Sequence, residues 1–136
     1  MKKKNFKVWL ILTIVWTVLI FGHSAMPASV SDQESLGILG FLQNIFPNLT
    51  NHVLRKIGHF TEFAVSGLFF TGTFWYHGRF RLSKPLLAAF LTGFADETLQ
   101  LFIPGRSGQI TDVWLDFSGA VVGVLLMWII FCIRKK

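Results

Sequence analysis

Charged side chains are scarce in this sequence of 136 residues. Asp, Glu, Lys and Arg together make up 15% of the chain, whereas about a quarter of a typical soluble domain is charged. Hydrophobic residues make up 52%, and 15 Phe and 5 Trp are among them. The chain is long enough for one domain, and a domain of this size has too little interior to hide so much apolar surface from water. We therefore predict an integral membrane protein that uses the bilayer as its solvent.

Cysteine is almost absent as well. The single Cys132 excludes an internal disulfide framework and a zinc site built from cysteines. It lies at the end of an apolar segment, where a lipid-facing side chain is the favoured interpretation and lipidation is the alternative. Basic residues give a net charge of +6, but they gather at the chain ends and in one short loop rather than on one folded face. This pattern argues against nucleic acid as a partner.

Four apolar segments approach the roughly 20 residues that a helix needs to span a membrane. They predict an all-α fold, a four-helix membrane bundle that forms one domain over residues 1–136. Between the first two segments, apolar residues recur at helical spacing over a stretch too short to span, so we expect a short amphipathic helix on the outer membrane surface. The first segment also resembles a secretory signal peptide, but small residues are poorly placed for cleavage, and a retained helix is favoured. The expected helices cover about residues 6–22, 57–76, 85–103 and 110–133, with the outer-surface helix at about 32–46.

The distribution of basic residues predicts the orientation of these helices. Lys and Arg in short loops stay on the cytoplasmic side of membrane proteins. Of the 13 in this chain, ten precede the first segment, lie between the second and third, or follow the fourth. We therefore expect a multi-pass protein of the cell membrane with both termini in the cytoplasm, and with Arg55, Lys56 and Arg106 outside. The ten cytoplasmic residues are Lys2, Lys3, Lys4, Lys7, Arg79, Arg81, Lys84, Arg134, Lys135 and Lys136.

Five of the seven acidic residues lie in or beside the apolar segments, although a charged side chain at the centre of a bilayer costs about 3 kcal/mol. The direction of each helix brings all five to the outer half of the membrane. Steps of three and four residues place them on one stripe of each helix, and three facing stripes predict an outward-opening polar pocket. Arg106, on the turn at 104–105, can lie over this pocket as a charge partner. The stripes are Arg55, His59, Glu62 and Ser66; Gly93, Asp96, Glu97 and Gln100; and Asp112, Asp116, Gly119 and Gly123.

This number of polar side chains exceeds what helix packing needs, so we interpret the pocket as a functional site, with a purely structural network as the alternative. Carboxyl groups in a confined site can transfer protons, which makes Glu62, Asp96 and Glu97 candidate catalytic acids and bases. His59 is the candidate for orienting or relaying protons. An arginine suits an anionic group of a substrate. The candidate substrate-binding residues are Arg106, Gln100, Asp112 and Asp116.

A metal centre is not predicted, and we expect no cofactor. Catalytic zinc sites usually contain more than one histidine, and the pocket supplies only His59. An oxygen-ligated cation such as Mg²⁺ or Ca²⁺ is the alternative, because carboxylates are abundant. A serine nucleophile is not supported either. Ser24 directly follows His23 along the chain rather than facing a base, and the sequence lacks a Gly-x-Ser-x-Gly turn.

The same residues resemble the VanZ-like family of bacterial membrane proteins. The resemblance covers nearly the whole chain, and its most specific part is the run DETLQLFIPGR at 96–106. The segment SAMP at 24–27 is similar to the early motif of the family. The other matching residues are the segment HFTEF at 59–63, Asp112, Gly119 and Gly123.

The resemblance implies a protein of the bacterial cell envelope, because the name-giving member of the family is associated with low-level resistance to the glycopeptide teicoplanin. Gln109 stands where the family commonly has Asp, and Asp116 stands where it commonly has Asn. We predict that the outward-facing site binds or modifies a lipid-linked or cell-wall component and contributes to glycopeptide resistance. The expected partners are the lipid bilayer and a lipid-linked envelope precursor or a glycopeptide.

The alternative function is a non-catalytic envelope protein that binds a lipid or an antibiotic, or that assists a partner protein. A proton-coupled carrier is disfavoured, because carriers are commonly built from repeats and these four segments show none. The sequence leaves open whether the protein is an enzyme.

Overall fold

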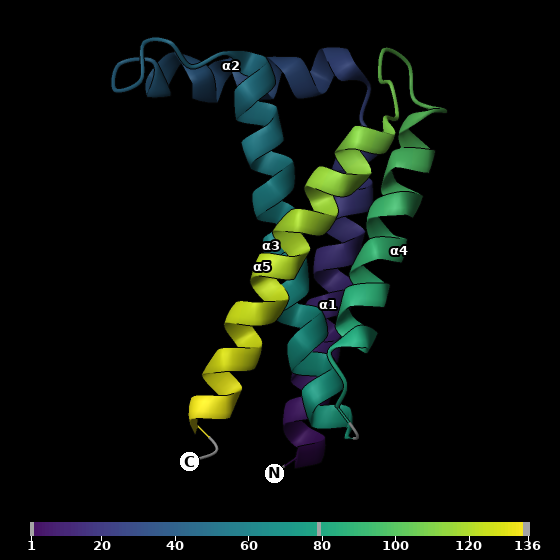
Figure 1. Ribbon diagram of the computed structural model, residues 1–136. Coiled ribbons are helices and arrows are strands. Elements are labelled where there is room, and N and C mark those ends of the chain that lie inside the picture. Colours follow the sequence, from purple (N-terminus) through teal and green to yellow (C-terminus); the bar gives the residue numbers. More distant parts are fainter. Residues whose placement is uncertain (1, 79, 135–136) are drawn as a thin grey trace.

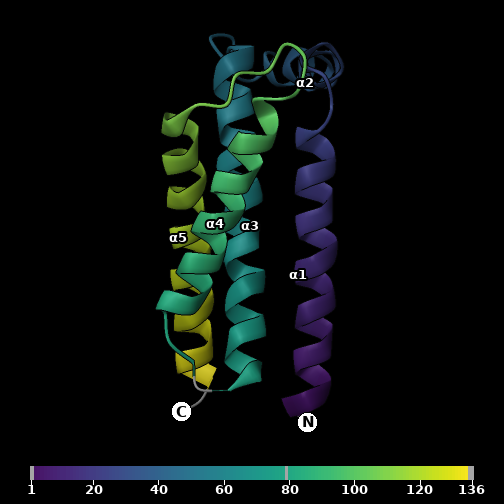
Figure 2. The ribbon, with the colours of Figure 1, turned by 90° about the vertical axis from the view of Figure 1, so that its right-hand side faces the viewer.

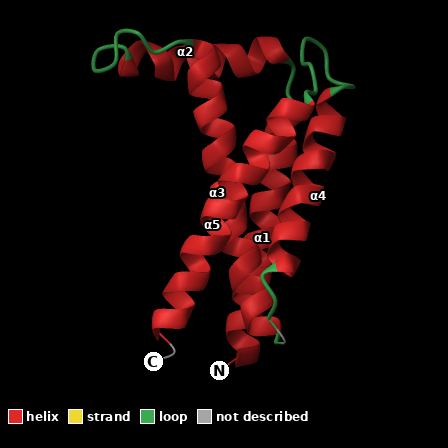
Figure 3. Ribbon diagram, in the orientation of Figure 1, coloured by secondary structure: helices red, strands yellow, loops and turns green. Residues whose placement is uncertain are grey.

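The computed structural model describes residues 2–78 and 80–134, with side chains from Asn5 onward, and this part of the chain contains helices and no strand. The prediction of an all-α fold is confirmed (Figure 3). The helices are α1 (Lys2–Ser24), α2 (Ala28–Leu42), α3 (Asn51–His77), α4 (Ser83–Gln100) and α5 (Ile110–Arg134).

Four of the helices, α1, α3, α4 and α5, run side by side, and α2 lies crosswise over one end of them (Figure 1). Figure 2 shows α1 standing along one side of the group formed by α3, α4 and α5. The central helix is α3, which packs against each of the other four. Both termini and the turn between α3 and α4 lie at the end of the bundle remote from α2 (Figure 1). The bundle therefore has two chemically distinct ends, one of which α2 covers.

The start and end of α3 follow from its flanking residues. The hydroxyl of Thr50 accepts a hydrogen bond of 3.3 Å from the backbone N–H of Val53, which caps the first turn. Gly78 ends the helix with a φ of 100°, a conformation that glycine adopts without a steric penalty. The cap extends α3 to Asn51, six residues before the expected start, so that its first turns reach up to α2.

Two other helices differ from their expected boundaries. The outer helix α2 begins at Ala28 and ends at Leu42 rather than covering 32–46, because Pro27 interrupts α1 and allows a new helix directly after it. The helix α4 ends at Gln100 rather than near 103. Isolated turns follow it as far as Pro104, a residue that disfavours helical conformation just before itself.

Glycines allow α3 and α5 to approach each other closely. A Cβ atom on Gly119 would overlap the backbone carbonyl of Phe60, and one on Gly123 would overlap that of Ala64. Small residues at such contacts are typical of helices that pack within membranes. These two glycines therefore hold the polar stripe of α5 directly against α3.

Apolar side chains cover the outside of the helices, and polar side chains lie between them. Val18 of α1 is 63% exposed and Leu91 of α4 is 55% exposed, whereas Asp96 and Asp116 are fully buried. This is the reverse of the pattern in a soluble protein. By length and composition, the segments Asn5–Ser24 and Ile110–Arg134 are apolar enough to cross a membrane. Ser66 of α3 and Asp96, Glu97 and Gln100 of α4 are buried between the helices, and polar residues of this kind lower the hydropathy of α3 and α4.

Candidate functional site

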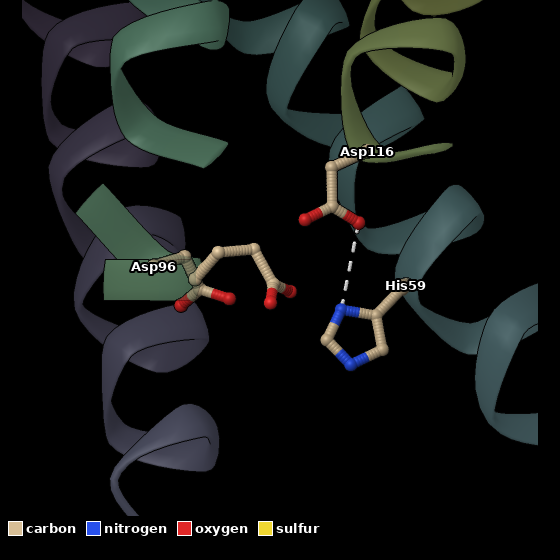
Figure 4. Close-up of side chains that lie close together, drawn as sticks. His59, Asp96 and Asp116 are labelled. Carbon is tan, nitrogen blue, oxygen red and sulfur yellow. Dashed lines mark ion pairs between the residues drawn. The ribbon is translucent and has the colours of Figure 1, made fainter. Parts of the chain in front are cut away.

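Side chains from three helices meet in the half of the bundle next to α2. His59 comes from α3, Asp96 and Glu97 from α4, and Asp116 from α5. A ring nitrogen or carboxylate oxygen from each lies within 4.8 Å of those from the other three. Figure 4 shows His59, Asp96 and Asp116 directed from their helices toward a common space. We call these four residues the carboxylate–histidine cluster. Each of the three predicted stripes contributes at least one residue to it.

Two amide groups hold the α4 carboxylates in place. The side-chain Nε2 of Gln100 donates to Oδ2 of Asp96 (3.1 Å) and to Oε1 of Glu97 (3.4 Å). The backbone N–H of Gln109 donates to the other oxygen of Glu97 at 3.0 Å. Gln100 also lies 3.5 Å from the hydroxyl of Ser24, which is buried at the end of α1. In this structure Gln100 therefore positions the acids and connects them to α1.

Several other polar atoms of the cluster lack a hydrogen-bond partner within the described residues. They are both carboxylate oxygens of Asp116, Oδ1 of Asp96 and Nδ1 of His59. The Nδ1 atom of His59 lies 3.5 Å from Oδ1 of Asp116, and the two form an ion pair when the imidazole is protonated. Buried polar atoms are normally satisfied, so these four atoms require a proton, a water molecule or a cation between them.

A cavity of about 350 Å³ opens beside the cluster, and we call it the polar cavity. His59 and Gln100 line it on the cluster side. Basic side chains outnumber acidic ones in the surrounding wall, so the polar cavity presents positive charge to a ligand. The three acids of the carboxylate–histidine cluster do not line the cavity and lie behind His59 and Gln100. The basic side chains are His52, Arg55, Lys56 and Arg106.

Two of these cations are paired within the wall of the polar cavity. Arg55 Nη1 lies 2.8 Å from Oδ1 of Asp32 on α2, and Lys56 is paired with Asp112 on α5. Both pairs are partly exposed, and such pairs contribute little to stability. An incoming anionic group can therefore replace a carboxylate at either cation at small cost.

The sequence predicts Arg106 as a charge partner over the pocket, and the structure gives it a second role. It lines the polar cavity, but its Nε donates to the backbone carbonyl of Met26 (2.9 Å) and its Nη2 donates to that of His23 (3.1 Å). Burial, together with the positive charge of Arg55, lowers the pKa of Arg106, although a guanidinium stays charged in proteins. Arg106 therefore ties the loop between α4 and α5 to the end of α1.

Glu62 lies outside the cluster. Its Oε1 is 3.5 Å from Nδ1 of His23, and it lines a second cavity of about 230 Å³ beneath α2. Ile38 of α2 and Leu54 of α3 give this second cavity a more apolar wall. We call it the side cavity. Two residues line both cavities, and these are Arg55 and His59.

A family model described as VanZ/LLP1 matches residues 9–131, a span that includes every residue lining the two cavities. The chain belongs to this family. The match confirms the resemblance found in the sequence. Membership of the VanZ/LLP1 family, with two helices apolar enough to cross a membrane, indicates a membrane-associated protein of the cell envelope. The chain matched no curated protein and no solved structure.

Sequence reasoning missed two residues of this VanZ/LLP1 site. His23 faces Glu62, and Ser24 is 1% exposed beside Gln100. Both lie at the end of α1. The spacing of polar residues on the other helices does not indicate which residues of α1 face the site. The segment 24–27, which resembles the early family motif, was a signal for Ser24, whereas no pattern in the sequence indicated His23. Of the predicted residues, four form the cluster, Gln100 positions it, Arg106 and Asp112 line the polar cavity, and Glu62 lines the side cavity.

Proposed function

We propose that α1, α3, α4 and α5 all span the cell membrane, with both termini in the cytoplasm and both cavities facing outward. The described basic residues support this orientation, because Lys7, Arg81 and Arg134 belong to the end with the termini. Arg55, Lys56 and Arg106 belong to the α2 end. Arg79, Lys135 and Lys136, and the side chains of Lys2, Lys3 and Lys4, lie outside the described residues.

The lengths and surfaces of the two more polar helices support their assignment as membrane spans. The 18 residues of α4 give a length of about 27 Å, close to the roughly 30 Å of the hydrocarbon core. Leu87, Leu91 and Phe94 are exposed on its surface, whereas its acids face the other helices. A helix with this arrangement is stable in lipid despite its charged residues.

The crosswise helix α2 is proposed to lie in the outer interface of the membrane. Leu36, Ile38 and Phe41 are all more than half exposed on it. Its orientation across the ends of the spanning helices is that of an interfacial helix (Figure 1). In this position α2 forms a cover above the side cavity.

The site is proposed to bind a lipid-linked component of the cell envelope that carries an anionic head group. The observation that carries this proposal is that the polar cavity and the side cavity are neighbours, with Arg55 and His59 lining both. Leu54 extends the side cavity into an apolar groove that Ile45 and Ile57 also line. A ligand with a charged head and an apolar chain matches this change from polar to apolar surface.

A contribution to teicoplanin resistance is part of the same proposal, and it rests on family membership. A site that holds a lipid-linked cell-wall precursor acts on the material to which glycopeptides are directed. The alternative is a non-catalytic protein that binds a lipid or an antibiotic. Arg55 and Lys56 already hold carboxylates in ion pairs, and exchange of these partners for an anionic ligand is sufficient for such binding without a chemical step.

The identity of co-purified lipid tests the proposal. The protein, purified in mild detergent, is expected to retain an anionic lipid-linked molecule enriched over bulk membrane lipid, as measured by mass spectrometry. Replacing Arg55 by Gln should remove most of this enrichment, because Arg55 faces both cavities. Replacing Lys7 by Gln, at the opposite end of α1, is the control and should have no effect. A lipid profile equal to that of the bulk membrane in all three proteins would refute the proposed ligand class.

A further inference from the structure

We infer that the carboxylate–histidine cluster binds one divalent transition-metal ion. The inference deepens the proposed function and rests on it for the role of the ion, although binding of the ion can be measured separately. The four candidate ligand atoms lie within 4.8 Å of one another. An ion held at roughly 2.0–2.4 Å from each ligand spans donor atoms up to about 4–5 Å apart. The four side chains are therefore close enough together to be candidates for ligands of a single ion between the helices.

The charge of the cluster supports a cation. Asp96, Glu97 and Asp116 bring three carboxyl groups into a space where His59 is the basic partner. In the described part of the chain, the ion pairs of Arg55 and Lys56 go to Asp32 and Asp112 instead. Buried charges in proteins are paired or coordinate metals. A doubly charged ion would offset two of the three negative charges that the ionised carboxyl groups carry.

Unsatisfied atoms provide an independent indication. Asp116 is 0% exposed, and within the described residues neither of its oxygens has a hydrogen bond of normal geometry, since the nearest partner is Nδ1 of His59 at 3.5 Å from Oδ1. Oδ1 of Asp96 and Nδ1 of His59 are in the same state. Figure 4 shows these three side chains facing one another. An acid that served only to hold helices together would have its oxygens bound to the neighbouring helix.

The remaining oxygens of the cluster are held as metal ligands usually are. Gln100 donates to both α4 carboxylates, and the backbone of Gln109 donates to Glu97. Hydrogen bonds of this kind orient metal ligands. Oδ1 of Asp96 is left free for the ion, whereas Glu97 accepts one hydrogen bond at each oxygen and would bind the ion through a remaining lone pair. Gly108 lets the loop before α5 lie this close to Glu97, because a Cβ at Gly108 would overlap the backbone carbonyl of Glu97.

The ligand set selects the class of metal. One imidazole with three carboxylates suits Mn²⁺ best, and Zn²⁺ accepts the same ligand types although its catalytic sites usually contain more than one histidine, whereas Ca²⁺ prefers six to eight oxygen ligands. Because His59 also lines both cavities, the ion lies next to the place proposed for the anionic head group. An oxygen of that head group can then complete the coordination of the ion. The sequence did not predict a metal centre, and it left a cation as an alternative.

Direct metal binding tests the inference. Protein that carries an affinity tag without histidine is purified in detergent, and bound metal is removed with EDTA. The protein is then titrated with MnCl₂ or ZnCl₂. Binding is measured by electron paramagnetic resonance for Mn²⁺ and by calorimetry for Zn²⁺. We expect about one ion per chain for at least one of the two metals, and a rise in Tm of at least about 5 °C at saturation. Stoichiometric binding of neither metal would overturn the inference.

Matched variants locate the ion. Asp116→Asn and Asp96→Asn should weaken binding at least about tenfold, whereas Glu62→Gln, an acid of α3 outside the cluster, should bind as the wild type does. The metal-free Asn variants should melt no lower than the metal-free wild type, because each removes one of three carboxyl charges that repel one another when no ion is bound. Equal binding by wild type and Asp116→Asn would overturn the inference. If the Asn variants do not purify, the wild-type titration and Glu62→Gln decide the question.

Lipid analysis of the EDTA-treated wild type separates this inference from the proposed function. An anionic lipid retained by protein that binds neither metal would leave the ligand proposal intact and refute the ion. A bound ion without enriched lipid would leave the metal site intact and refute the ligand proposal.

Discussion

Nδ1 of His59 lies 3.5 Å from Oδ1 of Asp116, and this contact joins α3 to α5 behind the polar cavity. The two residues meet because their helices touch one turn away, where Gly119 leaves room for the backbone carbonyl of Phe60. Helix packing and the chemistry of the site therefore depend on the same interface. An aliphatic side chain at Gly119 would separate His59 from Asp116.

Gly119→Val should therefore destabilise the protein. The added side chain cannot avoid the backbone of α3, and overpacking of this kind typically costs about 1–3 kcal/mol. We expect a lower Tm in detergent than that of the wild type. Gly22→Ala in α1 is the control, since a Cβ there has nothing within 4 Å. A Gly119→Val protein that melts with the wild type would show that the two helices do not meet as described.

Arg106→Lys is expected to lower stability although it conserves the charge. A lysine cannot make both hydrogen bonds that the guanidinium donates to the carbonyls of His23 and Met26. Loss of one bond from a charged donor should cost about 1.5–3 kcal/mol, and the end of α1 should become accessible to protease. Lys7→Arg, remote from the site, is the control. Unchanged Tm and protease resistance in Arg106→Lys would mean that Arg106 does not anchor α1.

The sequence was sufficient to predict the all-α fold, because helical periodicity and apolar length are local properties. It was also sufficient to predict that Asp96, Glu97, His59 and Asp116 lie in the same half of the bundle, because the direction of each helix follows from the chain order. It did not place Glu62 against His23 or Arg106 against the end of α1. Those contacts join residues distant in the chain, and they depend on the rotation of α1 about its axis, which an apolar segment without a polar stripe does not reveal.

Asp96→Asn and Asp116→Asn should abolish the contribution of the protein to teicoplanin tolerance. Both changes keep the shape of the side chain and remove a charge that the proposed site uses. We expect the minimal inhibitory concentration of teicoplanin to fall to that of cells without the protein, while the amount of protein in the membrane stays unchanged and the Tm, measured after EDTA treatment, equals that of EDTA-treated wild type. Lys7→Gln, which lines neither cavity, should preserve tolerance. A loss of Tm in step with tolerance would instead identify the cluster as a packing network.

The outward orientation of the polar cavity is the central claim, and the labelling of single cysteines tests it most directly. Cys132 is the one native thiol, so Cys132→Ser provides the background. Ser107, which lines the polar cavity, and Ser83, at the start of α4, are both exposed. In that background, Ser107→Cys should react with a membrane-impermeant maleimide in intact cells, whereas Ser83→Cys should react only after the membrane is permeabilised. The opposite pattern, with Ser83→Cys labelled first, would place the cavity in the cytoplasm and contradict the account.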